Sequence, residues 1–239
     1  MKRLSWRLII LAVALAACAG SASAQTTNWG HTTNCSGTLA PGTYTDVIVP
    51  ANAECVLPFR GTVTVTGNVK VESGASLLLP PIGIVTVTGN VKLESGASLG
   101  VPGEFAETFI VHGSLLGVDA NRISINGLHP ENVIIFGSVD LRGTTGQVVL
   151  GGMSIHGTLF ITYSRGDLPF ELFANVVGGN VVVLDNTTSS VCGQSSCFVI
   201  QGNAIGGSLV CKGNTPAPTS PPDLLNTVGG NKVEQCASL

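Results

Sequence analysis

The sequence is poor in charge, since only 10% of its 239 residues are Asp, Glu, Lys or Arg, whereas 31 residues are glycine. This composition is unusual for a helical globular protein and typical of short strands joined by tight turns. Basic residues are a minority, with 11 Lys and Arg against 14 Asp and Glu and a formal net charge of −3. Because phosphate binding requires a basic face, this balance excludes a nucleic acid as the expected partner.

Long apolar stretches are absent except at the N-terminus. There, Lys2, Arg3 and Arg7 precede an apolar run over residues 8–17. A run this short does not span a bilayer, and with its basic flank it indicates an export signal. We therefore expect an extracytoplasmic mature chain, secreted or periplasmic, with no transmembrane segment.

The export signal carries two overlapping processing patterns. Small residues at 22–24 suit cleavage before Gln25. Residues 15–18, Leu-Ala-Ala-Cys, instead resemble a bacterial lipobox, which predicts a membrane-anchored lipoprotein with its lipid on Cys18. Both alternatives stay open. The resulting boundaries are 1–24 for the signal peptide, or 1–17 with lipidation, and 25–239 for one domain.

The chain contains an internal repeat. Fifteen residues from Val63, VTVTGNVKVESGASL, return 22 positions later from Val85 as VTVTGNVKLESGASL, with one exchange of Val for Leu. The repeat then becomes less regular but can be followed through a central glycine at positions 67, 89, 113, 137, 157, 179, 207 and 230. A repeat of about 22 residues predicts an all-β, single-domain right-handed parallel β-helix of about eight to nine coils.

The positions around each central glycine indicate which side chains face inward. Two residues before it and two after it, the chain is aliphatic, with Lys232 as the one exception, and one after it is small and polar. Alternation with period two indicates a strand, whereas a helix would scatter the aliphatic residues around its circumference. Hairpins would bring identical residues together only on alternate strands, but coiling stacks each repeat about 4.8 Å above the last.

We expect three short strands and three corners in each coil. In one coil the candidate strands cover residues 122–125, 132–136 and 138–141. The aliphatic columns predict a dry interior, and the polar row after the glycine predicts side-chain hydrogen bonds along the stack. The central glycine fits a corner that needs unusual dihedrals or a close backbone approach.

Cysteine usage predicts disulfides, because six cysteines remain when Cys18 is set aside and an even number in an oxidising compartment favours pairing. Their order along the chain suggests Cys35 with Cys55, Cys192 with Cys197, and Cys211 with Cys236. The first and last pairs are each about one coil apart and are expected to join neighbouring coils at the two ends. Buried unpaired thiols are the alternative, and a zinc site is disfavoured because no histidine pair accompanies the cysteines.

The segments GTYTDVIVPANAECVL, the G-N-V coils and the closing IGGSLVCKGNTPAPT and NTVGGNKVEQC together resemble secreted bacterial β-helix proteins built from V-x-G-N-V repeats, whose function is largely uncharacterised. The resemblance covers nearly the whole mature chain. It implies the fold but no activity and no cofactor. Pectate-lyase-like enzymes, polymerising bactofilins and surface adhesins share this architecture rather than these motifs.

Three charged residues, Asp119, Asp140 and Arg142, are candidates for catalysis or calcium binding. Many glycosidases need two acids roughly 5 to 9.5 Å apart. Asp119 shares a column with Asp185, but three strand spacings separate them by about 14 Å. Asp140 and Arg142 stand where earlier coils carry a lysine and a glutamate, so the simpler interpretation is an exchanged surface ion pair.

Two further surface features are candidates for binding. His112, Phe136 and His156 fall in one outward row that suits stacking on sugar rings, although ordinary surface residues are the alternative. The two histidines are expected about 9.6 Å apart, too far to share a metal ion. Arg165 and Asp167 flank a glycine in an RGD tripeptide, an integrin-recognition motif that also occurs by chance, in an expected loop.

The stretch TPAPTSPP at residues 215–222 is rich in proline, which cannot donate to a strand ladder. We therefore expect this segment to leave the sheet before the last coil, as a surface excursion or a cap.

The sequence favours a non-enzymatic extracytoplasmic scaffold, structural or adhesive, at the cell surface or in the matrix. Its expected partners are glycans or cell-surface components, and it requires no metal or cofactor. The alternative is a polysaccharide-binding or polysaccharide-cleaving protein, a lyase or a glycoside hydrolase. A third possibility is self-association through end-to-end stacking of coils.

Overall fold

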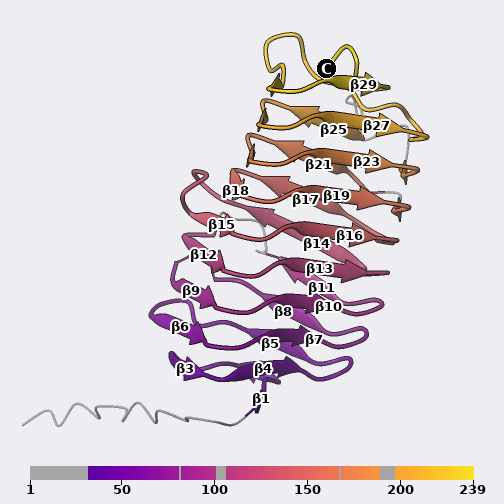
Figure 1. Ribbon diagram of the computed structural model, residues 1–239. Coiled ribbons are helices and arrows are strands. Elements are labelled where there is room, and N and C mark those ends of the chain that lie inside the picture. The colour runs from indigo at the N-terminus through magenta and orange to yellow at the C-terminus, as the bar shows by residue number, and fades with distance from the viewer. Residues whose placement is uncertain (1–31, 81, 101–105, 167, 189–196) are drawn as a thin grey trace, which may run out of the picture.

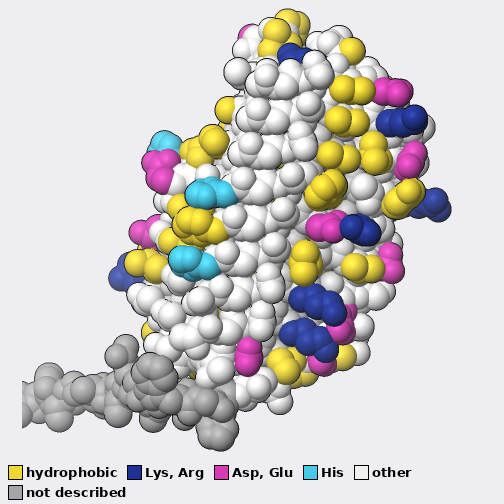
Figure 2. All heavy atoms as spheres, in the orientation of Figure 1, with side chains coloured by type: hydrophobic (Ala, Val, Ile, Leu, Met, Phe, Trp, Pro, Cys, Tyr) yellow, Lys and Arg dark blue, Asp and Glu magenta, His cyan; other side chains and the backbone are white. Residues whose placement is uncertain are grey.

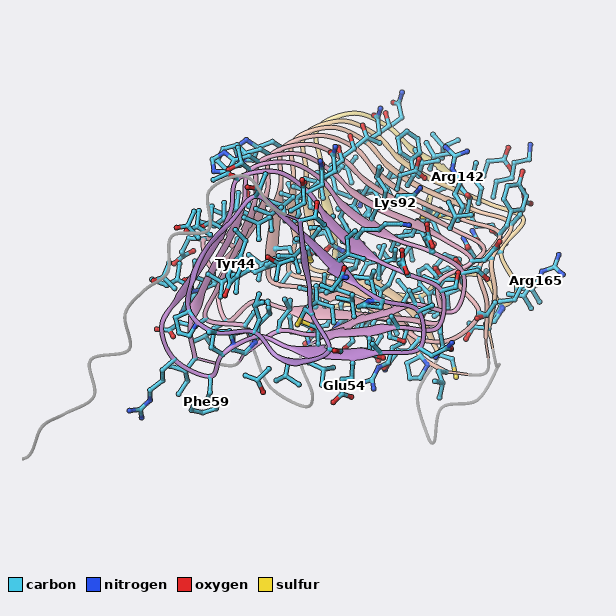
Figure 3. All side chains as sticks on the ribbon, turned by 90° about the horizontal axis from the view of Figure 1, so that it is seen from below. Tyr44, Glu54, Phe59, Lys92, Arg142 and Arg165 are labelled. Atoms are coloured by element: carbon cyan, nitrogen blue, oxygen red, sulfur yellow. A yellow bond between two sulfur atoms is a disulfide. The ribbon has the colours of Figure 1, made fainter. Side chains whose placement is uncertain are left out.

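The computed structural model describes residues 32–80, 82–100, 106–166, 168–188 and 197–239. The described chain is all-β and winds into a parallel β-solenoid of about eight turns with about 22 residues per turn, which confirms the predicted fold (Figure 1). Each turn contributes one short strand to each of three sheets, A, B and C, visited in the order C, A, B. Viewed from below, the turns superimpose and the three sheets surround the interior (Figure 3).

Every strand pair in the three sheets is parallel. Sheet A contains β1 (Thr32–Asn34), β4 (Asp46–Val49), β7 (Val69–Val71), β10 (Val91–Leu93), β13 (Leu115–Val118), β16 (Val139–Arg142), β19 (Leu159–Thr162), β23 (Val181–Leu184), β27 (Leu209–Lys212) and β29 (Lys232–Glu234). Sheet B contains β2 (Gly37–Thr38), β5 (Glu54–Val56), β8 (Ser76–Leu78), β11 (Ser98–Gly100), β14 (Arg122–Asn126), β17 (Val148–Gly151), β21 (Phe170–Phe173) and β25 (Phe198–Gln201). Sheet C contains β3 (Gly42–Tyr44), β6 (Thr62–Val65), β9 (Ile84–Val87), β12 (Thr108–Val111), β15 (Val133–Ile135), β18 (Met153–Ile155), β22 (Val176–Val177), β26 (Ala204–Ile205) and β28 (Thr227–Val228). A small separate sheet joins β20 (Arg165–Gly166) and β24 (Thr187–Thr188).

The strand register confirms the predicted columns. Val65 pairs with Val87, which pairs in turn with Val111, and all three are buried in the interior. The column two residues after the glycine stacks in the same way, from Val69 as far as Lys232. Burying each aliphatic side chain contributes on the order of 1.5 to 3 kcal/mol before chain entropy is counted, so these columns are the main source of stability.

The corner between sheets C and A holds the predicted polar row, and its side chains form a hydrogen-bonded ladder. The amide of Asn90 donates to Asn68 Oδ1 at 2.9 Å, and the amide of Ser114 donates to Asn90 Oδ1 at 2.8 Å. The same pattern links Asp46, Asn68, Asn90, Ser114, Ser138, Thr158, Asn180, Ser208 and Asn231. We call this row the outer ladder.

Glycine at this corner is required by close approach. A Cβ at Gly89 would lie 2.5 Å from the carbonyl oxygen of Gly67 and 2.6 Å from Asn68 Oδ1, both on the coil below. The same carbonyl accepts the Gly89 amide at 2.7 Å. Of the two reasons that the sequence offered for this glycine, the structure therefore supports close backbone approach.

Disulfides join neighbouring coils at the two ends of the described chain. Cys35 is bonded to Cys55, and Cys211 is bonded to Cys236, as predicted. Cys197 is also disulfide-bonded, and its predicted partner Cys192 lies outside the described residues.

The proline-rich segment departs from the sheet less completely than predicted. Thr219, which stands between two prolines of this segment and carries its own amide, forms a parallel bridge to Val199. Its amide donates to Phe198 O and its carbonyl accepts from the Ile200 amide, both at 3.0 Å. The segment therefore covers the edge of β25, which is consistent with a cap.

The described residues include no helix of the length and apolarity needed to cross a membrane. The predicted export signal and Cys18 lie outside the described residues, so the choice between the two processing patterns stays a prediction.

Candidate functional site

Asp140 and Arg142 form an ion pair on the outer face of sheet A. Arg142 Nε donates to Asp140 Oδ1 at 2.9 Å, and Arg142 Nη2 donates to Asp140 Oδ2 at 2.8 Å. These hydrogen bonds raise the pKa of Arg142 above its ordinary value. The pair lines a hollow of about 240 Å³, together with residues that include Lys92, Leu116 and Val118. Because both carboxylate oxygens of Asp140 are engaged, the geometry supports the exchanged ion pair that the sequence suggested rather than a catalytic acid.

Asp119 occupies the turn that follows β13. Its φ is 51°, a left-handed conformation that Asp tolerates better than most residues. The register places Gly143 and Tyr163 on the two coils between Asp119 and Asp185, which confirms the predicted separation of three coils. Among the described residues, no three His, Cys, Asp or Glu side chains are grouped so that they could hold a metal ion. Asp119 is accordingly a turn residue.

His112, Phe136 and His156 form the predicted row beside the corner between sheets C and A. The rings of His112 and Phe136 are stacked with centroids 4.9 Å apart, and those of Phe136 and His156 are tilted at 4.6 Å. Phe136 is 42% exposed. In Figure 2, two histidines flank a hydrophobic side chain along this edge. The row offers a strip of ring surface three coils long, bounded by Thr88 below and Gly178 above.

Arg165 and Gly166 lie in a short strand rather than in the predicted loop. They form β20, which pairs with β24, and the Arg165 amide also donates to Thr144 O at 2.7 Å on the coil below. The segments that leave the three sheets at the same corner of successive coils therefore pair with each other in parallel, as the strands of the sheets do. The Arg165 side chain points away from the body (Figure 3), and Asp167 lies outside the described residues.

Sheet B carries a hollow of about 620 Å³ that sequence reasoning missed. Its floor is formed by outward side chains of β21 and β25, and part of the proline-rich segment forms a wall. We call it the sheet B hollow. Its lining residues are Glu171, Phe173, Val199, Gln201, Thr219, Ser220 and Pro221.

The register explains how the floor of the sheet B hollow is assembled. Glu171 pairs with Val199, and Phe173 pairs with Gln201, so each of these residue pairs between β21 and β25 combines one apolar and one polar side chain. On the coil below, Phe173 pairs with Gly151. The far end of the Phe173 ring occupies the space that a side chain at Gly151 would fill. Gly151 thus makes room for the ring against the sheet.

Two polar groups in the sheet B hollow are available to a ligand. Within the described part of the chain, neither the Glu171 carboxylate nor the Gln201 amide makes a hydrogen bond, whereas Thr219 Oγ1 donates to Phe198 O at 3.2 Å and Ser220 Oγ to Leu224 O at 2.8 Å. The lining thus combines an aromatic ring, a carboxylate and a free amide. A single carboxylate does not provide the acid pair of a glycosidase.

The sequence signal for this hollow is weak but recognisable afterwards. In the stretch from Phe170 to Phe173, FELF, Glu171 and Phe173 alternate with buried residues, and glycine at position 151 lies under the outward phenylalanine. The wall comes from a segment about two coils' length further along the chain, which no repeat predicts.

Comparisons of the chain with models of protein families, with curated proteins and with solved structures found no match.

Proposed function

We propose that this protein is a non-enzymatic extracytoplasmic scaffold with a structural or adhesive role at the cell surface or in the matrix. The observation that carries the proposal is the outer ladder, which runs without a gap from Asp46 to Asn231. Each rung fixes the spacing of its coil to the next, so the ladder holds the outer rows in constant register. A rigid rod of this kind suits the display of surface residues better than closure around a substrate.

Two further observations support a location outside the cytoplasm. The disulfides at Cys35–Cys55 and Cys211–Cys236 suit an oxidising compartment. The N-terminal residues carry the pattern of an export signal. Secretion, periplasmic retention and lipid anchoring at Cys18 are the specific forms of this proposal, and the mass of the mature N-terminus distinguishes them.

The enzymatic alternative provides the test. Purified mature protein is incubated with polygalacturonate and with neutral polysaccharides, and new unsaturated or reducing ends are measured. We expect none above the level of a heat-denatured sample. Release of new ends that stops in an Asp140→Asn or a Glu171→Gln variant would contradict the non-enzymatic role and identify the acid responsible.

Polysaccharide binding without cleavage is the second candidate. It is favoured by the exposed rings of His112, Phe136 and His156, because stacked aromatic side chains present an apolar surface with a polar edge. Self-association by end-to-end stacking stays a prediction, and sedimentation of the purified protein tests it.

A further inference from the structure

We infer that the sheet B hollow is a binding site for a neutral oligosaccharide. The inference rests on the proposed adhesive role, because it names the class of partner and the place where that partner is held. A volume of about 620 Å³ lies within the range of about 300 to 1,000 Å³ that is usual for small-ligand sites. The size therefore suits a few sugar rings rather than a single small ion.

The floor of the hollow provides the apolar contact that a sugar needs. Phe173 and Val199 lie on it, and the Phe173 ring is held against the sheet because Gly151 has no side chain. One face of a pyranose ring consists of C–H groups, which pack on an aromatic ring. The hydroxyl groups at the rim of the pyranose ring remain free to form hydrogen bonds. A sugar therefore offers both the apolar and the polar surface that the hollow can contact.

The polar groups match hydroxyls. The Glu171 carboxylate can accept hydrogen bonds, whereas the Gln201 amide both donates and accepts. Neither has a partner within the described residues, so a ligand does not have to displace a protein contact. Glu171 lies two residues before Phe173 on β21, and Gln201 pairs with Phe173 from β25, so both polar groups occupy outward positions next to that of the phenylalanine.

The charge of the hollow excludes an acidic glycan. Glu171 is the one charged residue in the described lining, and no Lys or Arg is present there. The whole chain is also acidic, with a formal net charge of −3. A uronate or a sulfated sugar would meet an unpaired carboxylate, whereas a neutral sugar would not.

A peptide is a poorer occupant than a sugar. Peptides commonly bind sheets by adding a strand to an open edge. Here the edge of β25 is already occupied, because Thr219 accepts from the Ile200 amide and donates to Phe198 O. The main-chain groups that an added strand would use are therefore taken.

The test is calorimetric titration of the full mature chain with hexasaccharides of the cello, chito, malto and xylo series, and with hexagalacturonate as the acidic probe. We expect saturable binding of at least one neutral series and none of the acidic probe. Phe173→Ala should weaken that binding roughly tenfold, since one stacked ring is lost. Gln201→Leu, which keeps the volume and removes the amide, should weaken it several-fold, so the inference does not depend on one variant folding.

Two other phenylalanine variants separate the sheet B hollow from the rest of the surface. The control is Phe160→Ala, which removes a ring of 36% exposure from the outer face of sheet A and should bind the neutral sugar as the parent does. Phe136→Ala removes the central ring of the aromatic row and shows whether any of the sugar is held there instead. Thermal melting confirms that each variant is folded.

Four results would overturn the inference. The first three are that no neutral series binds, that the acidic probe binds in preference, or that Phe136→Ala abolishes binding while Phe173→Ala does not. The fourth is that an unstructured peptide binds in place of the sugars and that this binding is lost in Phe173→Ala. These results are distinct from failure of the proposed function. New sugar ends would contradict the non-enzymatic role while leaving the site in place, and loss of binding leaves the export and display of the scaffold untouched.

Discussion

The N-terminal and C-terminal coils close the corner between sheets A and B in different ways. In the N-terminal coils the corner is filled by buried alanines, Ala75, Ala97 and Ala120. In the C-terminal coils the same corner holds Asn186 and Asn214, which are buried and hydrogen-bonded to each other. One solenoid therefore uses both apolar packing and a satisfied polar network for the same task.

The difference follows the regularity of the chain. Asn68 and Asn90, in the nearly identical repeats, are 22 positions apart, whereas Asn186 and Asn214 are 28 apart. Irregular coils carry excursions that would loosen the register of a corner. A buried amide that bonds the main chain below and the side chain above fixes that register, so the ladders occur where coil length varies.

A second buried ladder supports this interpretation at the corner between sheets B and C. Asn175 Nδ2 donates to Leu150 O and to Asn203 Oδ1, both at 2.9 Å. Asn203 Nδ2 donates in turn to Asn226 Oδ1 at 2.8 Å. Asn175 and Asn203 are also 28 positions apart, so both inner ladders span a long coil.

The outer face of sheet A changes along the same direction. One outward column changes from Lys70, Lys92, Leu116 and Asp140 in the lower half to Phe160, Val182 and Val210 in the upper half. The two halves therefore differ in this column as well as in their corners, although charged side chains also occur on the upper coils (Figure 2).

Removing a buried rung should have the largest effect on stability and tests the comparison of the two corners most directly. Asn186→Ala leaves the buried Ser164 amide without its partner and removes the side-chain hydrogen bonds to Ile161 O and Asn214 Oδ1. We expect the free energy of unfolding to fall by about 3 kcal/mol or more, since buried polar groups without partners cost about 1 to 3 kcal/mol each. Guanidinium unfolding measures it.

The control for this variant lies in the outer ladder of the N-terminal coils. Asn90→Ala removes an exposed rung whose side chain accepts from the Ser114 amide, and water can replace it. Its cost should be about 1 kcal/mol. Equal costs for the two variants would contradict the idea that the buried ladder holds the C-terminal coils.

Extending the buried ladder should have a smaller, stabilising effect. Thr144 Oγ1 and Ser164 Oγ are buried and have no hydrogen-bond partner within the described residues. Because Asn186 Nδ2 donates to Ile161 O, and Ile161 pairs with Leu141, an asparagine at position 164 is placed to donate to Leu141 O. We expect Ser164→Asn to raise the free energy of unfolding by about 1 kcal/mol.

The matched control is Ser164→Ala, which removes an unpartnered hydroxyl and should be nearly neutral. A melting temperature lower for Ser164→Asn than for Ser164→Ala would show that this corner lacks room for the amide. The ladder would then be limited to the coils where it is observed.

The Lys70 ion pairs on sheet A should give the smallest effect on stability, visible in its pH dependence. Lys70 Nζ lies 3.0 Å from Glu72 Oε1 and 3.1 Å from Glu94 Oε1. Hydrogen bonds to these carboxylates raise the pKa of Lys70, and the bond from Lys70 lowers the pKa of Glu72. Stabilisation through Glu72 is therefore present above its unfolded pKa of about 4.3 and lost as the pH falls through the folded value. Stabilisation through Lys70 is present below about pH 10.4 and lost as the pH rises through its folded pKa.

Melting temperatures across this range test the assignment. The difference between the parent and Lys70→Met should be small near neutral pH and should disappear at both extremes. Lys212→Met, which removes an exposed pair with a 3.7 Å separation, should show no such window. A difference for Lys70→Met that persists at acid pH would point to lost packing instead of lost charge.

Much of the fold could be predicted because the repeats stack identical residues. The spacing from Val65 to Val87 sets both the period and the inward column, and the polar residue after each glycine identifies the outer ladder. The order of His112, Phe136 and His156 followed from the same register. Wherever successive coils have the same length and pattern, the position of a residue within the repeat determines where its side chain lies.

The inner ladders and the sheet B hollow could not be predicted in the same way. Asn186 and Asn214 follow left-handed turn residues, so they point inward although asparagine usually marks the surface. Phe173 and Thr219 meet through an excursion whose length no repeat fixes. Arg165 joined a strand because excursions on neighbouring coils pair. Each miss concerns a contact between segments of irregular length.

The hydrogen bonds of the outer ladder also have one direction. Every rung donates a main-chain N–H toward the coil nearer the N-terminus, and the central glycines do the same, as Gly89 does to Gly67. Three consecutive N–H groups at the corner, those of Thr88, Gly89 and Asn90, all point this way, so the N-terminal end of the corner presents N–H groups as the first turn of an α-helix does. At that end stands Asp46, the one ionisable member of the row, and its Oδ1 accepts from the Asn68 amide at 2.7 Å. A carboxylate thus begins the corner of this rod in the way that an aspartate caps the first turn of a helix.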